Sequence, residues 1–268
     1  MTSPPDSPAV LSRVADGVCT ITLNRPEAAN ALRPDDRDTL VGLLLHAEAD
    51  HDVRAVRLRA EGKIFCAGAD VGGIRGQSTD RRTGDAMRIL QRGAQKLIAG
   101  ILDCGKPVVA EVQGTAAGLG AHLAFACDLV VASDNAKFIE SFVLRGLVVD
   151  AAGAYLLPRR IGLQKAKELA MLGDALPATE ALALGLVNRV VPAADLASTT
   201  DELVARLAAG PTTAIALTKR LLNTSLDSDR NAAFLAEAMA QEIQMTAADA
   251  KEGPTAFMER RPPQYKGW

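Results

Sequence analysis

Two loops of small residues, each directly after an apolar run, place the strongest constraint on this chain. The first occupies residues 63–70 (KIFCAGAD) and the second residues 113–120 (QGTAAGLG). Because such loops lack bulky side chains, their backbone N–H groups can approach a ligand closely. Two converging N–H groups could hold the developing negative charge of an oxyanion. Taken alone, the spacing fits two compact turns as well, with Asp70 capping a following helical turn.

Length and composition limit the range of functions. The chain has 268 residues, of which 48% are hydrophobic and 23% charged, so it can bury a substantial core. Its net charge of −2 gives no electrostatic support for a nucleic-acid or membrane partner. We expect no transmembrane helix, because no apolar run is long enough. The four cysteines and three histidines are scattered without metal-ligand spacing, so we expect a cytoplasmic protein without a metal centre.

Periodic patterns predict a core of strands and helices followed by helices alone. Residues 1–8 are predicted to be a disordered tail, residues 9–194 the core, and residues 195–268 a helical region. The apolar faces of this last region predict packing on the core or on a neighbouring subunit. The predicted strands are 10–14, 18–24, 53–58, 108–112, 129–132, 137–139 and 186–191. The predicted helices are 34–49, 80–102, 119–126, 155–161, 164–172, 179–184, 196–209, 212–223, 230–248 and 253–259.

The glycines of the second loop also raise the alternative of a dinucleotide-binding loop. An apolar strand precedes them, a helix follows, and Asp134 lies near the position of the acidic residue that holds a ribose. The full G-x-G-x-x-G order is missing, however, because Leu123 stands where the last glycine belongs. A dinucleotide-binding oxidoreductase is therefore a weak alternative.

Several motifs in unbroken order resemble the crotonase, or enoyl-CoA hydratase/isomerase, superfamily. Besides the two loops, they are residues 146–153 (GLVVDAAG), 156–162 (LLPRRIG), 183–187 (ALGLV) and 251–261 (KEGPTAFMERR). The resemblance implies an α/β fold, a spiral of ββα units with a C-terminal helical region that builds trimers and usually dimers of trimers. It also implies an acyl-CoA thioester substrate, which carries its own coenzyme A, and no separate cofactor.

The same resemblance assigns roles to residues of the two loops. The backbone N–H groups of Ala69 and Leu119 match the two oxyanion donors. Many members have glycine where Leu119 stands, but a backbone donor survives that change. The carbonyl of Ala67 matches the adenine contact, and Lys63 lies where a basic residue can approach the CoA phosphates. The CoA-binding positions implied in this way are Ala29, Lys63, Ala67, Ala69, Asp70 and Val71.

The two glutamates of typical hydratases in this superfamily are replaced. Their positions hold His122 and Phe142, and a phenylalanine cannot activate water or deliver a proton. These replacements argue against the ordinary hydration of a double bond. His122 and Phe142 are retained as candidate substrate contacts. Glu140 is a third candidate, although we expect its side chain to face another direction than the lost glutamate.

Asp150 matches the acidic position of the isomerases in the superfamily, and its surroundings most resemble the 1,2-epoxyphenylacetyl-CoA isomerase branch. Independently of the resemblance, Asp150 lies between the apolar residues 147–149 and the small residues 151–153. Burial there would raise the pKa of its carboxyl toward a useful value for a general base. The structural alternative is an N-cap of the following helix.

The sequence therefore predicts an acyl-CoA enzyme in which Ala69 and Leu119 stabilise a thioester enolate while Asp150 moves a proton. The expected reaction is the isomerisation of a double bond or a ring. Two alternatives stay open. One is an enoyl-CoA hydratase in which Asp150, with or without His122, handles water. The other is a non-catalytic acyl-CoA-binding protein that kept the oxyanion hole and lost the acids.

Overall fold

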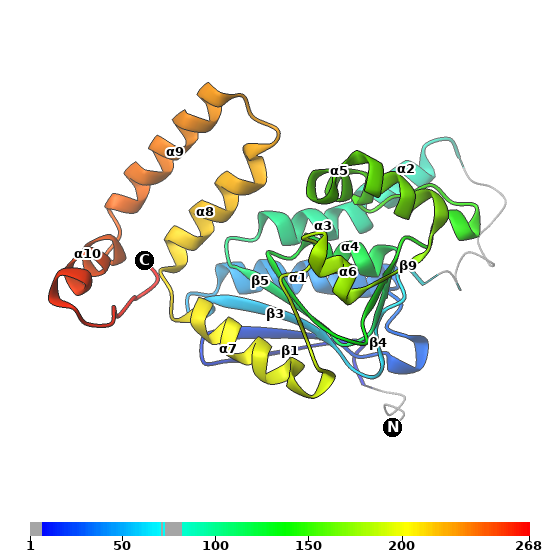
Figure 1. Ribbon diagram of the computed structural model, residues 1–268, viewed down its shortest axis with the longest axis horizontal. Coiled ribbons are helices and arrows are strands. Elements are labelled where there is room, and N and C mark those ends of the chain that lie inside the picture. The colour runs from blue at the N-terminus through cyan, green and yellow to red at the C-terminus, as the bar shows by residue number, and fades with distance from the viewer. Residues whose placement is uncertain (1–6, 71, 73–81) are drawn as a thin grey trace.

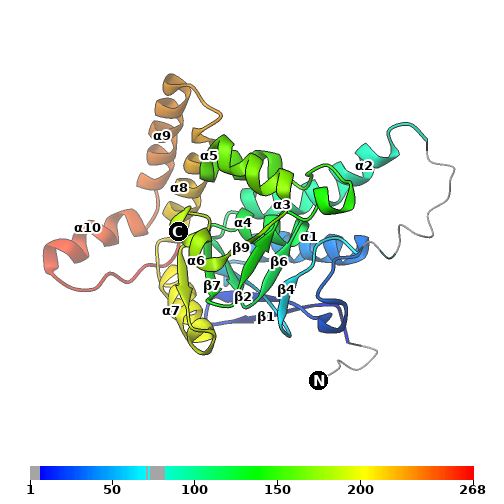
Figure 2. The same cartoon turned by 45° about the vertical axis from the view of Figure 1, so that its right-hand side comes forward.

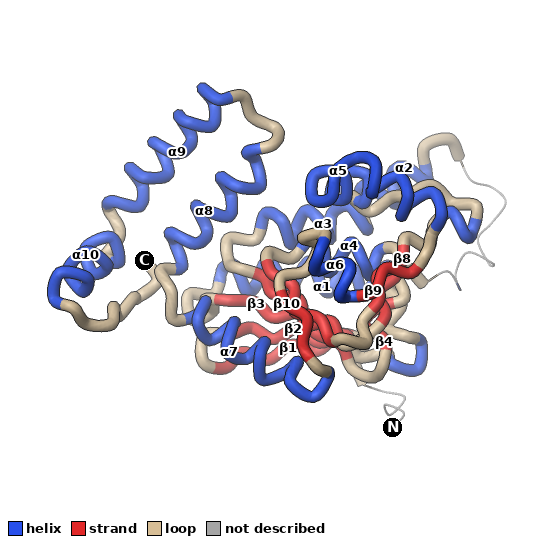
Figure 3. The backbone as a smooth tube through the Cα atoms, in the orientation of Figure 1, coloured by secondary structure: helices blue, strands red, loops and turns tan. Residues whose placement is uncertain are grey.

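The computed structural model describes residues 7–70, 72 and 82–268. A six-stranded sheet in the order β1-β2-β3-β5-β7-β10 lies at its centre (Figure 3). β1 and β2 form an antiparallel hairpin around Asp16 and Gly17, which both have positive φ, as an Asp-Gly turn requires. The other neighbouring strands are parallel. The strands are β1 (Val10–Ala15), β2 (Val18–Leu23), β3 (Ala55–Ala60), β5 (Val108–Val112), β7 (Leu129–Ser133) and β10 (Arg189–Val191).

A second sheet of four short strands runs on from the first. β3 leads directly to β4, β5 to β6, and β7 to β8, and these three continuations are parallel to one another. β9 pairs antiparallel with β8 and closes the sheet. β4 and β6 lie inside the segments predicted as loops, β8 matches the predicted strand 137–139, and β9 lies outside the predicted strands. The strands are β4 (Ile64–Cys66), β6 (Thr115–Ala117), β8 (Lys137–Ile139) and β9 (Ala175–Pro177).

Helices α1, α3 and α4 build the main core on one face of the large sheet. Every residue of α4 is buried, and Leu40 of α1 and Leu97 of α3 belong to the same apolar cluster as Leu123 of α4. The preference of proline for the first helical turn explains why α1 begins at Pro34. The helices of this part are α1 (Pro34–Ala49), α2 (Asp85–Arg92), α3 (Ala94–Asp103), α4 (Leu119–Ala126), α5 (Gly153–Leu172) and α6 (Ala178–Ala183).

The prediction of one continuous helix over residues 80–102 is wrong. Gly93 adopts non-helical angles, φ −109° and ψ −97°, and separates α2 from α3. A Cβ at this position would lie 2.8 Å from the carbonyl oxygen of Ile89, so the sharp break needs a glycine. Residues 80 and 81 lie outside the described part of the chain. By contrast, the two helices predicted over 155–161 and 164–172 are present as halves of α5, which kinks at Gly162 with φ 74°.

The chain after β10 is helical, as the sequence predicts. α7 packs on the opposite face of the large sheet, where Leu203 and Val204 meet Val109 and Val131. α8, α9 and α10 extend away from the core, on the side opposite to α2 (Figure 1, Figure 2). The four helices are α7 (Leu196–Ala208), α8 (Thr212–Ser225), α9 (Arg230–Met245) and α10 (Asp249–Glu259). The division near residue 194 into two regions stays a prediction.

Polar contacts hold α8 and the N-terminal segment on the core. Nζ of Lys219 in α8 lies 2.9 Å from Oδ2 of Asp128 and donates to the carbonyl of Ile101. Asn24, directly after β2, donates an exposed hydrogen bond to the carbonyl of Pro8, the last residue of the predicted tail. Residues 1–6 lie outside the described residues. Within the part that the structure describes, no helix is both long and apolar enough to span a membrane.

Candidate active site

The predicted oxyanion donors follow two adjacent parallel strands. β4 pairs with β6, so the chain leaves both strands at the same edge, toward Ala69 and Leu119. A Cβ built on Gly68 would lie 3.5 Å from the backbone nitrogen of Leu119, which shows how close the two loops are. Among the described residues, neither the N–H of Ala69 nor that of Leu119 donates to another backbone group. Leu119 is also the first residue of α4, whose dipole favours negative charge.

The segment with the predicted CoA contacts is tied to the segment before α1. The N–H of Ala67 donates to the carbonyl of Ala29, and the N–H of Asp70 donates to the carbonyl of Leu32. The N···O distance is 3.0 Å in both hydrogen bonds. The structure therefore brings Ala29 together with Ala67 and Asp70. Lys63 is exposed and precedes β4, whereas Ala67, Asp70 and the Ala29 bound to Ala67 lie at the other end of this strand. Val71 lies outside the described residues.

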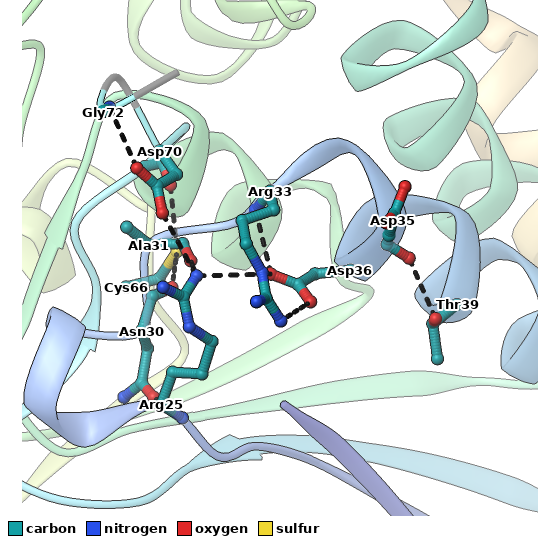
Figure 4. A network of polar contacts seen from close by, with 11 residues as sticks. Arg25, Asn30, Ala31, Arg33, Asp35, Asp36, Thr39, Cys66, Asp70 and Gly72 are labelled. Carbon is teal, nitrogen blue, oxygen red and sulfur yellow. Dashed lines mark hydrogen bonds and ion pairs between the residues drawn. The ribbon is translucent and has the colours of Figure 1, made fainter. Parts of the chain in front are cut away.

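Arg25 is the centre of a polar network that fixes this segment (Figure 4). Its Nη1 lies 2.9 Å from the carbonyl oxygen of Ala31, 3.2 Å from Oδ2 of Asp70 and 3.4 Å from Oδ2 of Asp36. Burial would raise the pKa of Asp36, but hydrogen bonds from the side chain and backbone of Arg33 hold it below its usual value. Asp70, which follows the donor Ala69, is thus bound to the start of α1 through Arg25.

His122 is fully buried in α4 and meets the two other candidate substrate contacts. Its Nε2 lies 2.9 Å from Oε2 of Glu140. Its ring stacks on Phe142, with centroids 5.5 Å apart and planes inclined by 15°. The expectation that Glu140 faces away from this group is wrong. Glu140 follows the last residue of β8, Ile139, and both Glu140 and Phe142 contact His122.

Phe142 also closes the space toward the second oxyanion loop. A Cβ built on Gly118 would lie 3.5 Å from Cζ of Phe142, so the ring lies against the residue that precedes the donor Leu119. At the position of a hydratase glutamate, the structure therefore places an apolar surface. The three candidate contacts form one compact group, with Glu140 bound to His122 and Phe142 stacked on it.

Asp150 is half-buried in the turn that leads into α5. Burial raises the pKa of its carboxyl, while electrostatic interactions with His122 and Arg37 act in the opposite direction. Asp150 is not the N-cap of α5, because Ala152 occupies that position and no side chain caps the helix. Arg37 lies in the first half of α1 and acts electrostatically on Asp150 only because of the fold, so no pattern in the sequence points to it.

The backbone around Asp150 is held in an unusual conformation. Ala151 and Ala152 both have positive φ, 45° and 65°, a region that residues with a Cβ rarely adopt. Such backbone strain is often found at functional sites, where the surrounding structure maintains it. The N–H of Gly153 closes this turn by donating to the carbonyl of Asp150, with an N···O distance of 2.9 Å.

The enoyl-CoA hydratase/isomerase family model matches residues 13–268, so the chain belongs to this family. It is 35% identical over 254 residues to a probable enoyl-CoA hydratase of Rhodobacter capsulatus, covering 95% of this chain and 96% of that one. It is also 35% identical over 258 residues to the 1,2-epoxyphenylacetyl-CoA isomerase of Escherichia coli, covering 96% and 98%.

A solved structure of a putative enoyl-CoA hydratase from Streptomyces coelicolor has the same fold. It superposes with a TM-score of 0.92 at 36% identity, covering 100% of this chain and 98% of the other. The predicted crotonase-type α/β fold, with parallel sheets and a C-terminal helical region, is thereby confirmed. The relatives bear both hydratase and isomerase names, so the family does not by itself define the reaction.

Proposed function

We propose that this chain is an enoyl-CoA isomerase that moves a proton with the carboxylate of Asp150. The observation that carries the proposal is the occupation of the two hydratase glutamate positions by His122 and Phe142, which pack on each other. In this group Glu140 is already bound to His122. Asp150, with its raised pKa, is then the carboxyl left to act as a base.

The proposed reaction begins with the thioester oxygen of a Δ3-enoyl-CoA between the N–H groups of Ala69 and Leu119. Asp150 removes a proton from C2, and the electron pair moves onto the thioester oxygen to give a dienolate. Each N–H donor to this oxygen contributes about 3–4 kcal/mol to stabilisation of the transition state. The carboxyl of Asp150 then returns the proton to C4, and the double bond moves to C2–C3.

This sequence of steps leaves Asp150 as it began and changes no oxidation state. It therefore requires no redox cofactor, and coenzyme A enters as part of the substrate. The surroundings of Asp150 suit the task, because burial raises the pKa of its carboxyl and makes the carboxylate more basic, while His122 and Arg37 limit the rise.

Asp150→Asn tests the proposal, because asparagine keeps the shape of the side chain and cannot accept the proton. We expect kcat for double-bond migration in a Δ3-enoyl-CoA to fall by about 10²–10⁴-fold, the usual contribution of a general base. Binding of a saturated acyl-CoA should be retained. The matched control is Asp134→Asn, on an exposed aspartate after β7. If the Asp150→Asn variant isomerises the substrate at the wild-type rate, the assignment is refuted.

Hydration is the second candidate, and the His122–Glu140 pair favours it. An imidazole bound to a carboxylate can activate water, and one relative is named a probable enoyl-CoA hydratase. Hydration of trans-Δ2-enoyl-CoA at a rate equal to or above isomerisation would promote this candidate. Tight binding without turnover on a panel of acyl-CoA substrates would instead favour a non-catalytic binding protein.

We also propose that the active form is a homotrimer or a dimer of trimers. The helices that extend from the core carry large exposed apolar side chains, and such a surface needs a partner. These side chains are Leu222, Phe234, Leu235, Met239, Ile243, Met245, Phe257 and Met258. Light scattering on the purified protein would give the mass of the assembly. All four cysteines are free and buried, in keeping with the proposed cytoplasmic location.

A further inference from the structure

His122 has one ring nitrogen whose partner is missing. Nε2 is bound to Glu140, but Nδ1 has no hydrogen-bond partner among the described residues, although the side chain is fully buried. A buried polar atom without a partner is costly, so its presence requires an explanation. A group that is bound only while the enzyme works would provide one.

The imidazole ring cannot turn to relieve this. Phe142 covers one face, and a Cβ on Gly153 would overlap Cε1 and Nε2 of the ring. The same Cβ would lie 2.7 Å from Cγ2 of Val149, so the ring lies against the turn that carries Asp150. The N–H of Gly153 binds the carbonyl of Asp150 in that turn. His122 is therefore fixed beside the backbone of Asp150, with Nδ1 in a set direction.

Charges act on Asp150 from two neighbouring elements. His122 comes from α4 and Arg37 from α1, and both lower the pKa that burial raises. Glu140, which follows β8, is the carboxylate that faces His122 on its other side. A positive charge on the ring would thus lie between two carboxyl groups.

We propose that Glu140 and His122 form a buried positioning dyad for Asp150, in which the Nδ1–H of the His122 imidazolium binds the Asp150 carboxylate in the working enzyme. The inference rests on the proposed function, because it takes Asp150 as the base. The contact requires the half-exposed Asp150 side chain to rotate toward Nδ1 of His122. The ring keeps both protons throughout, and only Asp150 exchanges a proton with substrate. The dyad orients the carboxylate and keeps it ionised in apolar surroundings.

His122→Gln tests the roles of the two ring nitrogens separately. A glutamine amide can reach the position of Nε2 and keep the contact with Glu140, but it has no atom at the position of Nδ1. Removal of a positive charge raises the pKa of Asp150, so the acid limb of kcat/KM should move to higher pH by about one unit. Glu140→Gln should move the limb the other way, to lower pH, because an imidazolium without its compensating carboxylate stabilises the Asp150 carboxylate more strongly. KM should change little in both variants.

Thr200→Val is the control for a buried polar change without a role in the dyad. Thr200 is fully buried in α7, where its hydroxyl donates to the carbonyl of Leu196. Loss of this hydrogen bond should reduce stability and leave the acid limb of the kcat/KM profile in place. If His122→Gln lowers kcat/KM equally at all pH values, or leaves the profile unchanged, the proposed dyad is wrong.

A measurement without turnover separates this inference from the proposed function. The chain has 3 histidines, so a ¹⁵N-histidine spectrum is simple, and His122→Gln assigns the His122 signal by its loss. Because coupling between two sites is reciprocal, Asp150→Asn should lower the titration midpoint of His122 by about one pH unit as well. An unchanged midpoint overturns the dyad. A shifted midpoint in an enzyme that isomerises no enoyl-CoA would overturn the proposed function and leave the dyad standing.

Discussion

Gly120 lies so close to Cys66 that a Cβ on residue 120 would overlap the carbonyl oxygen of Cys66 and lie 2.8 Å from its Cβ. Cys66 ends β4 and Gly120 lies in the first turn of α4, so this contact sets the spacing between the two loops that carry the proposed oxyanion donors. Gly114 stands in the same relation to the carbonyl of Lys63 at the other end of β4. The glycines of the second loop are thus explained by packing between loops, and no dinucleotide is needed to account for them.

Gly120→Ala should therefore separate the two oxyanion donors. We expect a loss of about 1–3 kcal/mol in the free energy of unfolding, as for other overpacked sites, with a fall in kcat larger than the rise in KM. Urea unfolding and steady-state kinetics measure the two effects. Gly42→Ala is the control, because a Cβ there meets nothing within 4 Å inside α1. It should raise stability by about 0.5–1 kcal/mol. If the two variants have the same stability and kinetics, the structure around Cys66 accommodates the added Cβ at little cost.

The parts of the fold that the sequence predicts are those with a long periodic pattern. The hairpin, α1, the strand at 108–112 and the C-terminal helices each have their own local signal. The break at Gly93 had none, because the apolar spacing continues from α2 into α3 across it. β4 and β6 are strands only because they pair with each other, which no local pattern reveals.

The candidate site, like the fold, has a part that the sequence predicts and a part that it does not. The order of motifs locates the two loops, His122, Phe142 and Asp150, because these positions are read from the chain itself. The contact between His122 and Glu140 depends on how the chain leaves β8, and the effect of Arg37 on Asp150 depends on packing between distant elements. Neither has a sequence signal, and both bear directly on the chemistry of Asp150.

Arg25→Met tests whether the network before α1 positions the first oxyanion donor. The change leaves Asp36 with Arg33 alone and releases Asp70, so stability should fall by about 1.5–3 kcal/mol, the range for hydrogen bonds to charged groups. Because Ala69 precedes Asp70, kcat/KM should fall by about tenfold, with no shift of the acid limb. Thermal unfolding and pH-dependent kinetics check both expectations.

The control for Arg25 is Arg88→Met, which removes an exposed ion pair with Asp85 in α2. Exposed pairs of this kind contribute about 0–1 kcal/mol, so stability should hardly change. If Arg25→Met behaves like this control in both stability and kcat/KM, the network has no positioning role.

Lys219→Met tests how α8 is held on the core. It leaves Asp128 without its ion-pair partner, and burial already raises the pKa of that carboxyl. Breaking such a buried pair costs about 3–5 kcal/mol, and urea unfolding should show it.

Asp128→Asn completes a double-mutant cycle, in which the double variant should lose less stability than the sum of the losses in the single variants. Lys165→Met, at an exposed pair with Glu168, should cost no more than about 0.5 kcal/mol. Additive losses in the cycle would contradict a direct Lys219–Asp128 interaction.

Asp150→Asn should stabilise the protein while it removes activity. Burial raises the pKa of Asp150 in the folded state above its unfolded value, so the folded protein binds this proton more tightly. The contribution to stability is thus fully present below the unfolded pKa of about 4 and is lost as pH rises through the folded pKa. At pH 7 the neutral asparagine avoids the cost of a half-buried charge. We expect a gain of roughly 0.5 kcal/mol, small because water still reaches the side chain and screens it. Urea unfolding at pH 7 and pH 4 measures the difference, which should disappear at the lower pH. A variant that is less stable than the wild type at pH 7 would mean that the cations His122 and Arg37 outweigh burial.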